Sequence, residues 1–258
     1  MKFSVRGALA ALALTALAAP AVAADLPARN TAPVFTQTDT SWSPWQIRVR
    51  ALGVLPDSSG KIYDTNGTLL RAGQQIPNAG VKASDSVVPE LDISYFFTKN
   101  IAVEAICCVT PHDVKGTGIL SGLDIGRTLL FPPTVLLQYH FVELGALQPY
   151  VGVGVNYTHF FGLKTGGNSI VDPLIPAGTD SVTALKIKDS VGLALQAGFD
   201  YMIDRHWGIN VDVKKVWIDP NANAVVTNKQ GAVLTNVPVN AKVKIDPWLV
   251  GAGVTYRF

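Results

Sequence analysis

Four histidines and two adjacent cysteines are the side chains in this 258-residue sequence best suited to acid–base, nucleophilic or metal chemistry. A nucleophilic enzyme needs a serine or a similar group within hydrogen-bond reach of a base. The histidines are His112, His140, His159 and His206, and no H-x-S pattern occurs in the chain. We therefore predict no catalytic residues, no metal site, no cofactor and no enzymatic activity.

Cys107 and Cys108 are neighbours in the chain, so in an extended strand their side chains point to opposite faces. A disulfide between neighbours would distort the strand, and two cysteines alone make a poor metal site. We interpret them as two small apolar strand residues. Oxidation with another chain stays open, because extracytoplasmic compartments permit disulfides.

Eight charged residues stand at alternate positions in segments that are otherwise largely apolar. Alternate side chains of a strand share one face, so these charges would point into one enclosed space. Buried charges are kept by pairing with one another, because unpaired burial costs several kcal/mol per ion. We interpret the set as a structural charge plug rather than a substrate site. Its members are Arg48, Arg50, Glu90, Asp92, Glu104, Asp200, Asp212 and Lys214.

Further along the same faces, the inward positions change from charged to apolar. The apolar set consists of Leu52, Val54, Val88, Ile106, Leu136, Phe160, Val216 and Ile218. One interpretation is an apolar outer vestibule that admits a hydrophobic molecule, and the other is simple packing of a narrow interior. The residues alone leave both open.

The segments that must position these side chains show the two-residue period of β-strands. In the last one, Trp248, Val250, Ala252, Val254, Tyr256 and Phe258 form an apolar face, opposite a face of small and polar residues. The aromatic ends of that face are spaced to span a membrane, roughly 25 Å at about 3.3 Å per residue. The predicted strands are Trp45–Leu55, Ser86–Phe97, Ile101–Thr110, Pro133–Phe141, Pro149–Phe161, Ile187–Met202, His206–Asp219 and Asn240–Phe258. In the last strand the apolar phase slips by one residue, which predicts a β-bulge at Asp246–Pro247.

These eight strands predict an all-β fold. Because single-chain barrels have an even number of strands, we predict an eight-stranded antiparallel transmembrane β-barrel of the outer membrane. Only 16% of the residues are charged, yet no segment after the leader offers the apolar run of a membrane helix. Four segments rich in Gly, Asn, Thr and Pro are predicted to be long loops on the extracellular side. They are Pro56–Asp85, Pro111–Pro132, Gly162–Lys186 and Pro220–Pro238.

The N-terminus predicts secretion. Lys2 and Arg6 precede the apolar run Ala8–Ala19, and Ala21–Ala23 reads A-x-A, as in a signal peptide spanning residues 1–23. Its removal takes two of the 21 basic residues and none of the 19 acidic ones, so the mature chain is close to neutral and no nucleic-acid partner is expected. Residues 24–44 are interpreted as a flexible periplasmic segment, and residues 45–258 as the barrel.

Several stretches resemble the OmpW family of small outer-membrane proteins. They read I-A-V-E-A at 101–105, T-P at 110–111, P-P-T at 132–134, P-Y-V-G-V-G-V-N-Y-T at 149–158, K-D-S-V-G at 188–192, D-Y-M-I-D-R at 200–205 and D-P-W at 246–248. The resemblance implies an eight-stranded barrel in the bacterial outer membrane, with a narrow apolar channel that passes small hydrophobic molecules sideways into the membrane.

The residues and the resemblance together predict a passive channel for small hydrophobic molecules, with an apolar vestibule and lateral exit. The alternative is a structural or adhesive surface barrel, a receptor for phage or host contact, without transport. The expected partners are outer-membrane lipid, small hydrophobic molecules, and the outer-membrane assembly machinery, which would read the strand that ends at Phe258.

Overall fold

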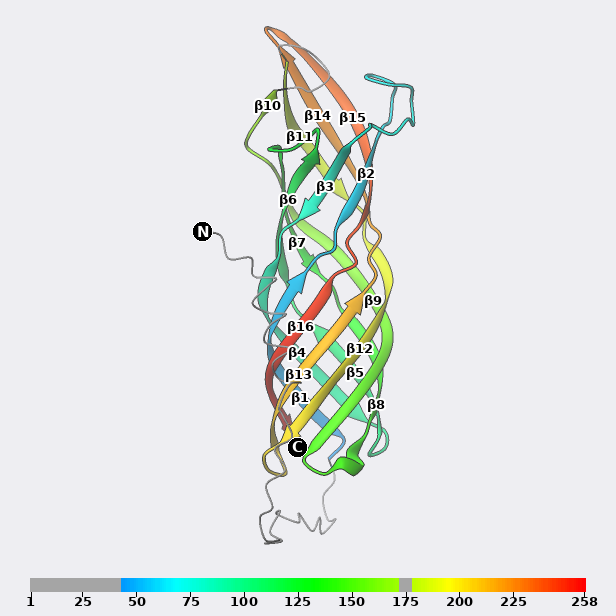
Figure 1. Ribbon diagram of the computed structural model, residues 1–258, viewed down its shortest axis with the longest axis vertical. Helices are drawn as coiled ribbons and strands as arrows, with labels where there is room; N and C mark the ends of the chain where they lie inside the picture. The colour runs from blue at the N-terminus through cyan, green and yellow to red at the C-terminus, as the bar shows by residue number, and fades with distance from the viewer. Residues whose placement is uncertain (1–42, 172–177) are drawn as a thin grey trace, which may run out of the picture.

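The computed structural model describes residues 43–171 and 178–258, and its central element is a closed antiparallel β-barrel (Figure 1). Each barrel strand pairs with the next, and the last pairs with the first, so the barrel wall closes on itself. The eight strands are β1 (Trp45–Leu55), β4 (Ser86–Phe96), β5 (Ile101–Cys107), β8 (Thr134–His140), β9 (Leu147–Thr165), β12 (Ser190–Met202), β13 (Trp207–Val216) and β16 (Trp248–Arg257). The predicted fold class is confirmed.

The outward face of the barrel is apolar and carries aromatic side chains at its ends. Along β16, Trp248 and Val254 are exposed while Gly251 and Thr255 are buried, as the two-residue period requires. At the end with short turns, aromatic rings meet edge to face in the pairs Trp45–Tyr95, Tyr95–Phe97, Tyr139–Phe141, Trp207–Tyr256 and Tyr256–Phe258. Such a girdle marks a membrane interface.

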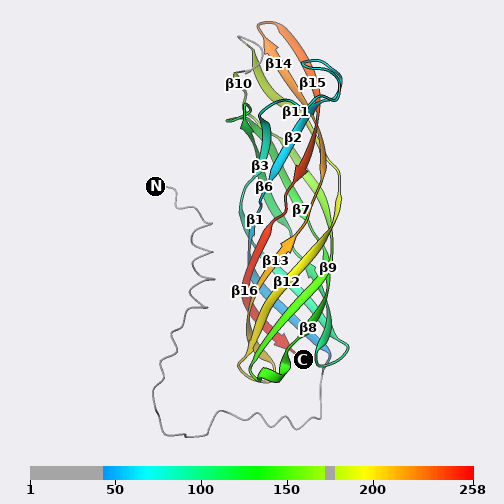
Figure 2. The same ribbon diagram turned by 45° about the vertical axis from the view of Figure 1, so that its right-hand side comes forward.

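Beyond the other end of the barrel, the wall continues as two further groups of strands (Figures 1 and 2). One group consists of β3 (Ala79–Ala83), β6 (Thr110–Gly118) and β7 (Asp124–Phe131), which pair with one another and with the upper part of β9. The other is the sheet of β10 (Ile170–Val171), β11 (Thr179–Ile187), β14 (Asn221–Gln230), β15 (Val233–Lys244) and β2 (Ser59–Asp64).

The prediction of four long loops was therefore wrong. The segments Pro56–Asp85, Pro111–Pro132, Gly162–Lys186 and Pro220–Pro238 supply most of these upper strands. The first pairs with the second through β3 and β6, and the third pairs with the fourth through β11 and β14. Composition identified the Gly and Asn residues but not these long-range pairings. The short link from β8 to β9 contains the 3-10 turn η1 (Val142–Leu144).

The predicted last strand, Asn240–Phe258, is two strands. β15 ends at Lys244 in the upper sheet, and β16 begins at Trp248 in the barrel. The phase slip at Asp246–Pro247 is real, but it marks a break between two sheets instead of a bulge within one strand. Asp246 has a positive φ of 28°, and its Oδ1 accepts a hydrogen bond from the backbone N–H of Ile218.

The predicted signal peptide and nearly all of the predicted periplasmic segment lie outside the described residues. No helix in residues 43–171 and 178–258 is long and apolar enough to cross a membrane.

Candidate functional site

The lower half of the barrel interior is filled by charged side chains. The inward positions of β1, β4, β5, β12 and β13 bring all eight members of the charge plug together, each at most 2% exposed. The Arg48 guanidinium lies between two acids: Nη2 is 2.7 Å from Asp200 Oδ2, and Nη1 contacts Glu104. These pairings join β1 to β12 and β5 across the interior.

Arg50 and Lys214 tie the remaining acids into the same network. Arg50 forms ion pairs with Glu90 at 3.0 Å, Asp92 at 2.5 Å and Asp212 at 3.4 Å. Lys214 Nζ lies 2.8 Å from Glu90 and 2.7 Å from Asp212. Every charge of the cluster thus has an opposite charge close by, which offsets much of the desolvation of these ions.

Neutral polar residues complete the network, and sequence reasoning did not single them out. Gln196 Nε2 donates to Glu104 at 3.0 Å and to Asp212 at 2.7 Å. Tyr150 donates its hydroxyl proton to Asp212 at 3.2 Å, and its ring lies 4.8 Å from the Arg48 guanidinium carbon. Both residues stand at inward positions of predicted strands, so alternation alone could have found them. Together with the charged residues, these side chains fill this half of the barrel interior.

Above the plug, the interior becomes apolar. All eight residues of the predicted vestibule are buried, and they fall into two adjoining clusters that Leu249 contacts in common. A cavity of about 40 Å³ lies here, and its lining includes Glu90 and Lys214 of the plug. Five of the predicted vestibule residues line it, namely Leu52, Val54, Ile106, Val216 and Ile218. Val88 and Leu136 are packed in the wall and line neither this cavity nor the one above it.

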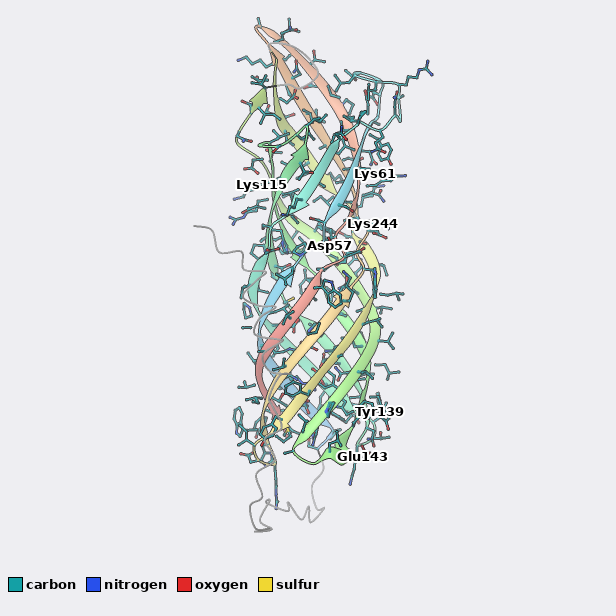
Figure 3. The ribbon with its side chains drawn as sticks, viewed as in Figure 1. Asp57, Lys61, Lys115, Tyr139, Glu143 and Lys244 are labelled. Carbon is teal, nitrogen blue, oxygen red and sulfur yellow. The ribbon has the colours of Figure 1, made fainter. Side chains whose placement is uncertain are left out.

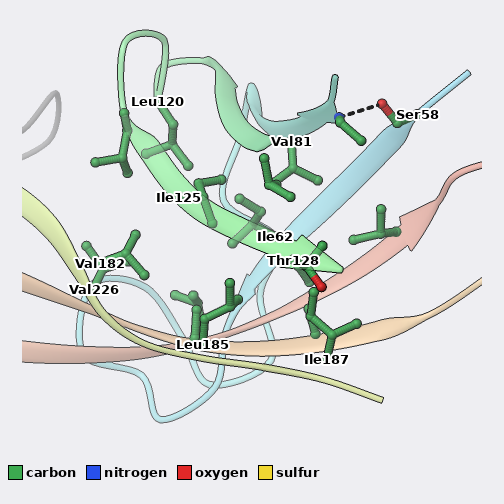
Figure 4. Close-up of a pocket in the computed structure, with 18 of the residues that line it drawn as sticks. Ser58, Ile62, Val81, Leu120, Ile125, Thr128, Val182, Leu185, Ile187 and Val226 are labelled. Carbon is green, nitrogen blue, oxygen red and sulfur yellow. Dashed lines mark hydrogen bonds between the residues drawn. The ribbon is translucent and has the colours of Figure 1, made fainter. Parts of the chain in front are cut away.

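A larger cavity, of about 120 Å³, occupies the part of the molecule that lies above the barrel (Figure 4). Its walls come from the upper strands and include Ile62, Val81, Ile125, Val182 and Val226, whose side chains converge on the same space. Of the predicted vestibule, Phe160 alone reaches it. Sequence reasoning missed this cavity because it assigned most of the segments that line it to loops.

The two cavities adjoin. His112, Leu130 and Ile245 line both of them, and the lower cavity also borders Glu90 and Lys214 of the plug. In Figure 3 the barrel and the upper strands form one elongated body, with Lys61 and Lys115 on the outside of the upper part and Tyr139 and Glu143 at the opposite end.

The barrel wall is interrupted beside the lower cavity. The ladder between β4 and β5 ends at Leu91 opposite Cys107, and the ladder between β3 and β6 begins at Ala83 opposite Val114. Within the described residues, no paired register joins residues 86–90 to residues 108–112. Pro89 and Pro111 lie in this interval and lack the N–H that a ladder needs. We call this interval the β4–β6 seam.

The two cysteines lie at this seam and face opposite ways, as predicted. Cys107 is exposed on the outer wall, Cys108 is buried and lines the lower cavity, and both are free thiols. On the outer wall elsewhere, His159 lies 3.0 Å from Asp189, and the Tyr157 hydroxyl donates to the same carboxylate at 2.5 Å.

A closed antiparallel barrel with a lipid-compatible outer face, an aromatic girdle and a charged interior defines the class of outer-membrane β-barrel proteins. The comparisons specify the family. The OmpW family profile matches residues 44–258, and the chain belongs to the OmpW family. The protein is therefore located in the bacterial outer membrane, where its barrel contacts lipid.

Three relatives match over nearly their whole length. The chain is 44% identical to the uncharacterized outer-membrane protein y4mB of Sinorhizobium fredii, over 96% of this chain and 95% of the relative. It is 33% identical to outer membrane protein W of Vibrio cholerae, over 90% and 95%. It is 25% identical to the dibenzothiophene metabolism operon protein PahQ of Pseudomonas aeruginosa, over 88% and 95%.

Among solved structures, the chain is similar to the outer membrane protein OprG of Pseudomonas aeruginosa. The TM-score is 0.69 at 28% sequence identity, covering 84% of this chain and 96% of OprG. Of these relatives, y4mB, outer membrane protein W and OprG are named as outer-membrane proteins.

Proposed function

We propose that this protein is a passive channel through which small hydrophobic molecules enter the outer membrane. The observation that carries the proposal is the pair of adjoining, mainly apolar cavities, the lower of which borders the buried cluster of charges. In this proposal the two cavities form one passage. A hydrophobic molecule is stabilised in such a passage by removal of its apolar surface from water. The charge plug bars the way into the periplasm, so the molecule needs a second exit.

The β4–β6 seam is the proposed exit. Cys108, which lines the lower cavity, lies in the interval where the wall lacks a hydrogen-bonded ladder. Opening such an interval breaks no ladder hydrogen bonds, whereas opening elsewhere in the wall would expose unsatisfied backbone groups to lipid. A hydrophobic molecule that leaves there passes directly into the hydrocarbon layer.

Similarity to PahQ supports this choice of substrate class. PahQ is named as a protein of a dibenzothiophene metabolism operon, and dibenzothiophene is an apolar aromatic compound. In this account the plug is structural, the protein performs no chemistry and needs no cofactor. Residues 1–23 act as the signal peptide, residues 24–44 remain in the periplasm, and the strand ending at Phe258 is read by the assembly machinery.

Uptake assays test the proposal. The cells lack their own related barrel and are compared with and without this protein. The measured quantity is the rate of uptake of a hydrophobic fluorescent probe and of a polar probe of equal size. We expect faster uptake of the hydrophobic probe only, and loss of that gain in Leu52→Asp and Phe160→Asp. Leu234→Asp is the matched control, because Leu234 is 65% exposed on β15 and lines neither cavity.

Two outcomes contradict the proposal. Equal uptake of both probes would indicate an ordinary small pore. Uptake of neither, by a barrel shown to be folded in the outer membrane, would favour the structural or adhesive alternative.

A further inference from the structure

The junction of the two cavities contains a polar group that the transport proposal does not use. His112 is 3% exposed and lines both cavities, whereas the other two shared residues, Leu130 and Ile245, are apolar. Thr128, 2% exposed, is directly opposite His112 in the β6–β7 ladder and lines the upper cavity, where Figure 4 labels it among apolar side chains. We call His112, Thr128, Leu130 and Ile245 the waist of the passage.

The hydrogen bonding of His112 fixes which of its nitrogen atoms is available. Nδ1 lies 2.7 Å from the carbonyl oxygen of Ser84, so it must carry the proton and donate it. In the neutral imidazole, Nε2 is then an acceptor. Burial lowers the pKa of His112 below its usual value, against the opposing effects of the Ser84 hydrogen bond and of Asp113 and Asp85, so the ring is neutral at neutral pH.

Nε2 has no hydrogen-bond partner among the described residues. The Thr128 hydroxyl is only weakly engaged, at 3.4 Å from the carbonyl oxygen of Leu129 and 3.5 Å from that of Phe161. The other polar residues of the upper cavity have partners: Ser58 accepts from the Ala83 N–H at 3.0 Å, and Asp180 accepts from Asn228 at 3.0 Å. Among the polar side chains that line the upper cavity, the acceptor without a protein partner is therefore at the waist.

We propose that the waist selects hydrophobic molecules that carry one hydrogen-bond donor, such as alcohols and phenols, over pure hydrocarbons. The inference rests on the proposed transport function and specifies its substrate class. The apolar body of the molecule occupies the cavity, and its hydroxyl group donates to Nε2 of His112. A hydrocarbon of equal size displaces water from that acceptor without replacing its hydrogen bond, which weakens its binding.

Binding measurements on the full-length protein, folded in detergent micelles, test the waist. The probes are 4-ethylphenol and 4-ethyltoluene, which have similar shape and differ by a hydroxyl against a methyl group. Each competes with a fluorescent hydrophobic dye, and each Kd is compared between variants so that partition into the micelle cancels. In His112→Phe we expect the Kd of 4-ethylphenol to rise about fivefold, the value of one ordinary hydrogen bond, while that of 4-ethyltoluene stays within about twofold.

Two further variants separate specificity from packing. His112→Gln restores an acceptor and retains most of the preference for the phenol. Ile125→Val alters the wall of the upper cavity away from the waist and changes both Kd values by the same factor. A phenol preference that survives unchanged in folded His112→Phe, or that is absent from the unaltered protein while both probes bind, would overturn the waist proposal and leave the transport proposal standing. Failure of both probes to bind would overturn both proposals.

Discussion

Removal of Arg48 tests whether the charge plug is sealed from water. Arg48, Asp200 and Glu104 have fully buried side chains, so Arg48→Met removes one cation and leaves Asp200 without its ion-pair partner, while Glu104 keeps Arg50 at 3.7 Å. Breaking a buried ion pair from one side costs about 3–5 kcal/mol. With a urea m-value of about 3 kcal/mol per M, the unfolding midpoint should fall by about 1–1.7 M.

The assay is reversible urea unfolding in lipid vesicles, followed by tryptophan fluorescence. Arg71→Met is the matched control, because Arg71 is exposed in the segment after β2, and it should change stability by no more than about 0.5 kcal/mol. The double variant Arg48→Met with Asp200→Asn should recover part of the loss, since it removes one stranded charge. A loss below about 1 kcal/mol in Arg48→Met would refute the reasoning, because it would mean that water already screens these charges.

Three other predictions follow from separate parts of the molecule. Asp64 accepts hydrogen bonds from the backbone N–H groups of Asn66, Gly67, Leu69 and Leu70; burial opposes its ionisation, but these donors lower its pKa. The stability that Asp64 gives this segment is therefore complete above the usual pKa of about 4 and is lost as pH falls towards the lowered value. Hydrogen exchange of residues 65–74 should become faster over that pH range. Asp64→Asn should abolish this pH dependence. A membrane-dissolved maleimide should label Cys107 much faster than Cys108, and equal rates would contradict their placement on opposite faces. Gly154→Ala should destabilise the barrel by about 1–3 kcal/mol, because its Cβ would lie 2.0 Å from the carbonyl oxygen of Val135; an unchanged urea midpoint would contradict that close approach.

The barrel could be predicted because its strands satisfy a local rule. Alternation of apolar and polar residues, as in Trp248–Phe258, is imposed on each strand separately by lipid outside and an enclosed space inside. The same rule placed Arg48, Glu104 and Asp200 on inward faces without knowledge of which strands are neighbours. It could not give the pairings, because Arg48 and Asp200 are 152 positions apart in the chain and meet only when the strands between them have formed the wall.

The upper strands could not be predicted in the same way. Their segments contain Gly, Asn and Pro at the density of loops, and their pairing depends on other segments far away in the chain, as when Lys61 of β2 meets Lys242 of β15. The upper cavity and the waist follow from that pairing. The seam could be predicted in part, because Pro89 lies within one predicted strand and Pro111 directly follows another. Its position beside Cys108 could not, because it depends on which residues of the neighbouring strands are paired.

Closure of the β4–β6 seam tests the central claim most directly. With Cys107→Ser and Cys108→Ala as background, Pro89→Cys and Val109→Cys place two outward thiols on opposite sides of the seam, to be joined by a reducible dithio-bismaleimide cross-linker. The matched control is Ile93→Cys with Ala105→Cys, whose positions are paired directly across the continuous β4–β5 ladder. If hydrophobic molecules leave through the seam, cross-linking at 89 and 109 blocks uptake of the hydrophobic probe, reduction restores it, and the control cross-link has no effect. Undiminished uptake through a barrel whose seam is fully cross-linked would contradict the account.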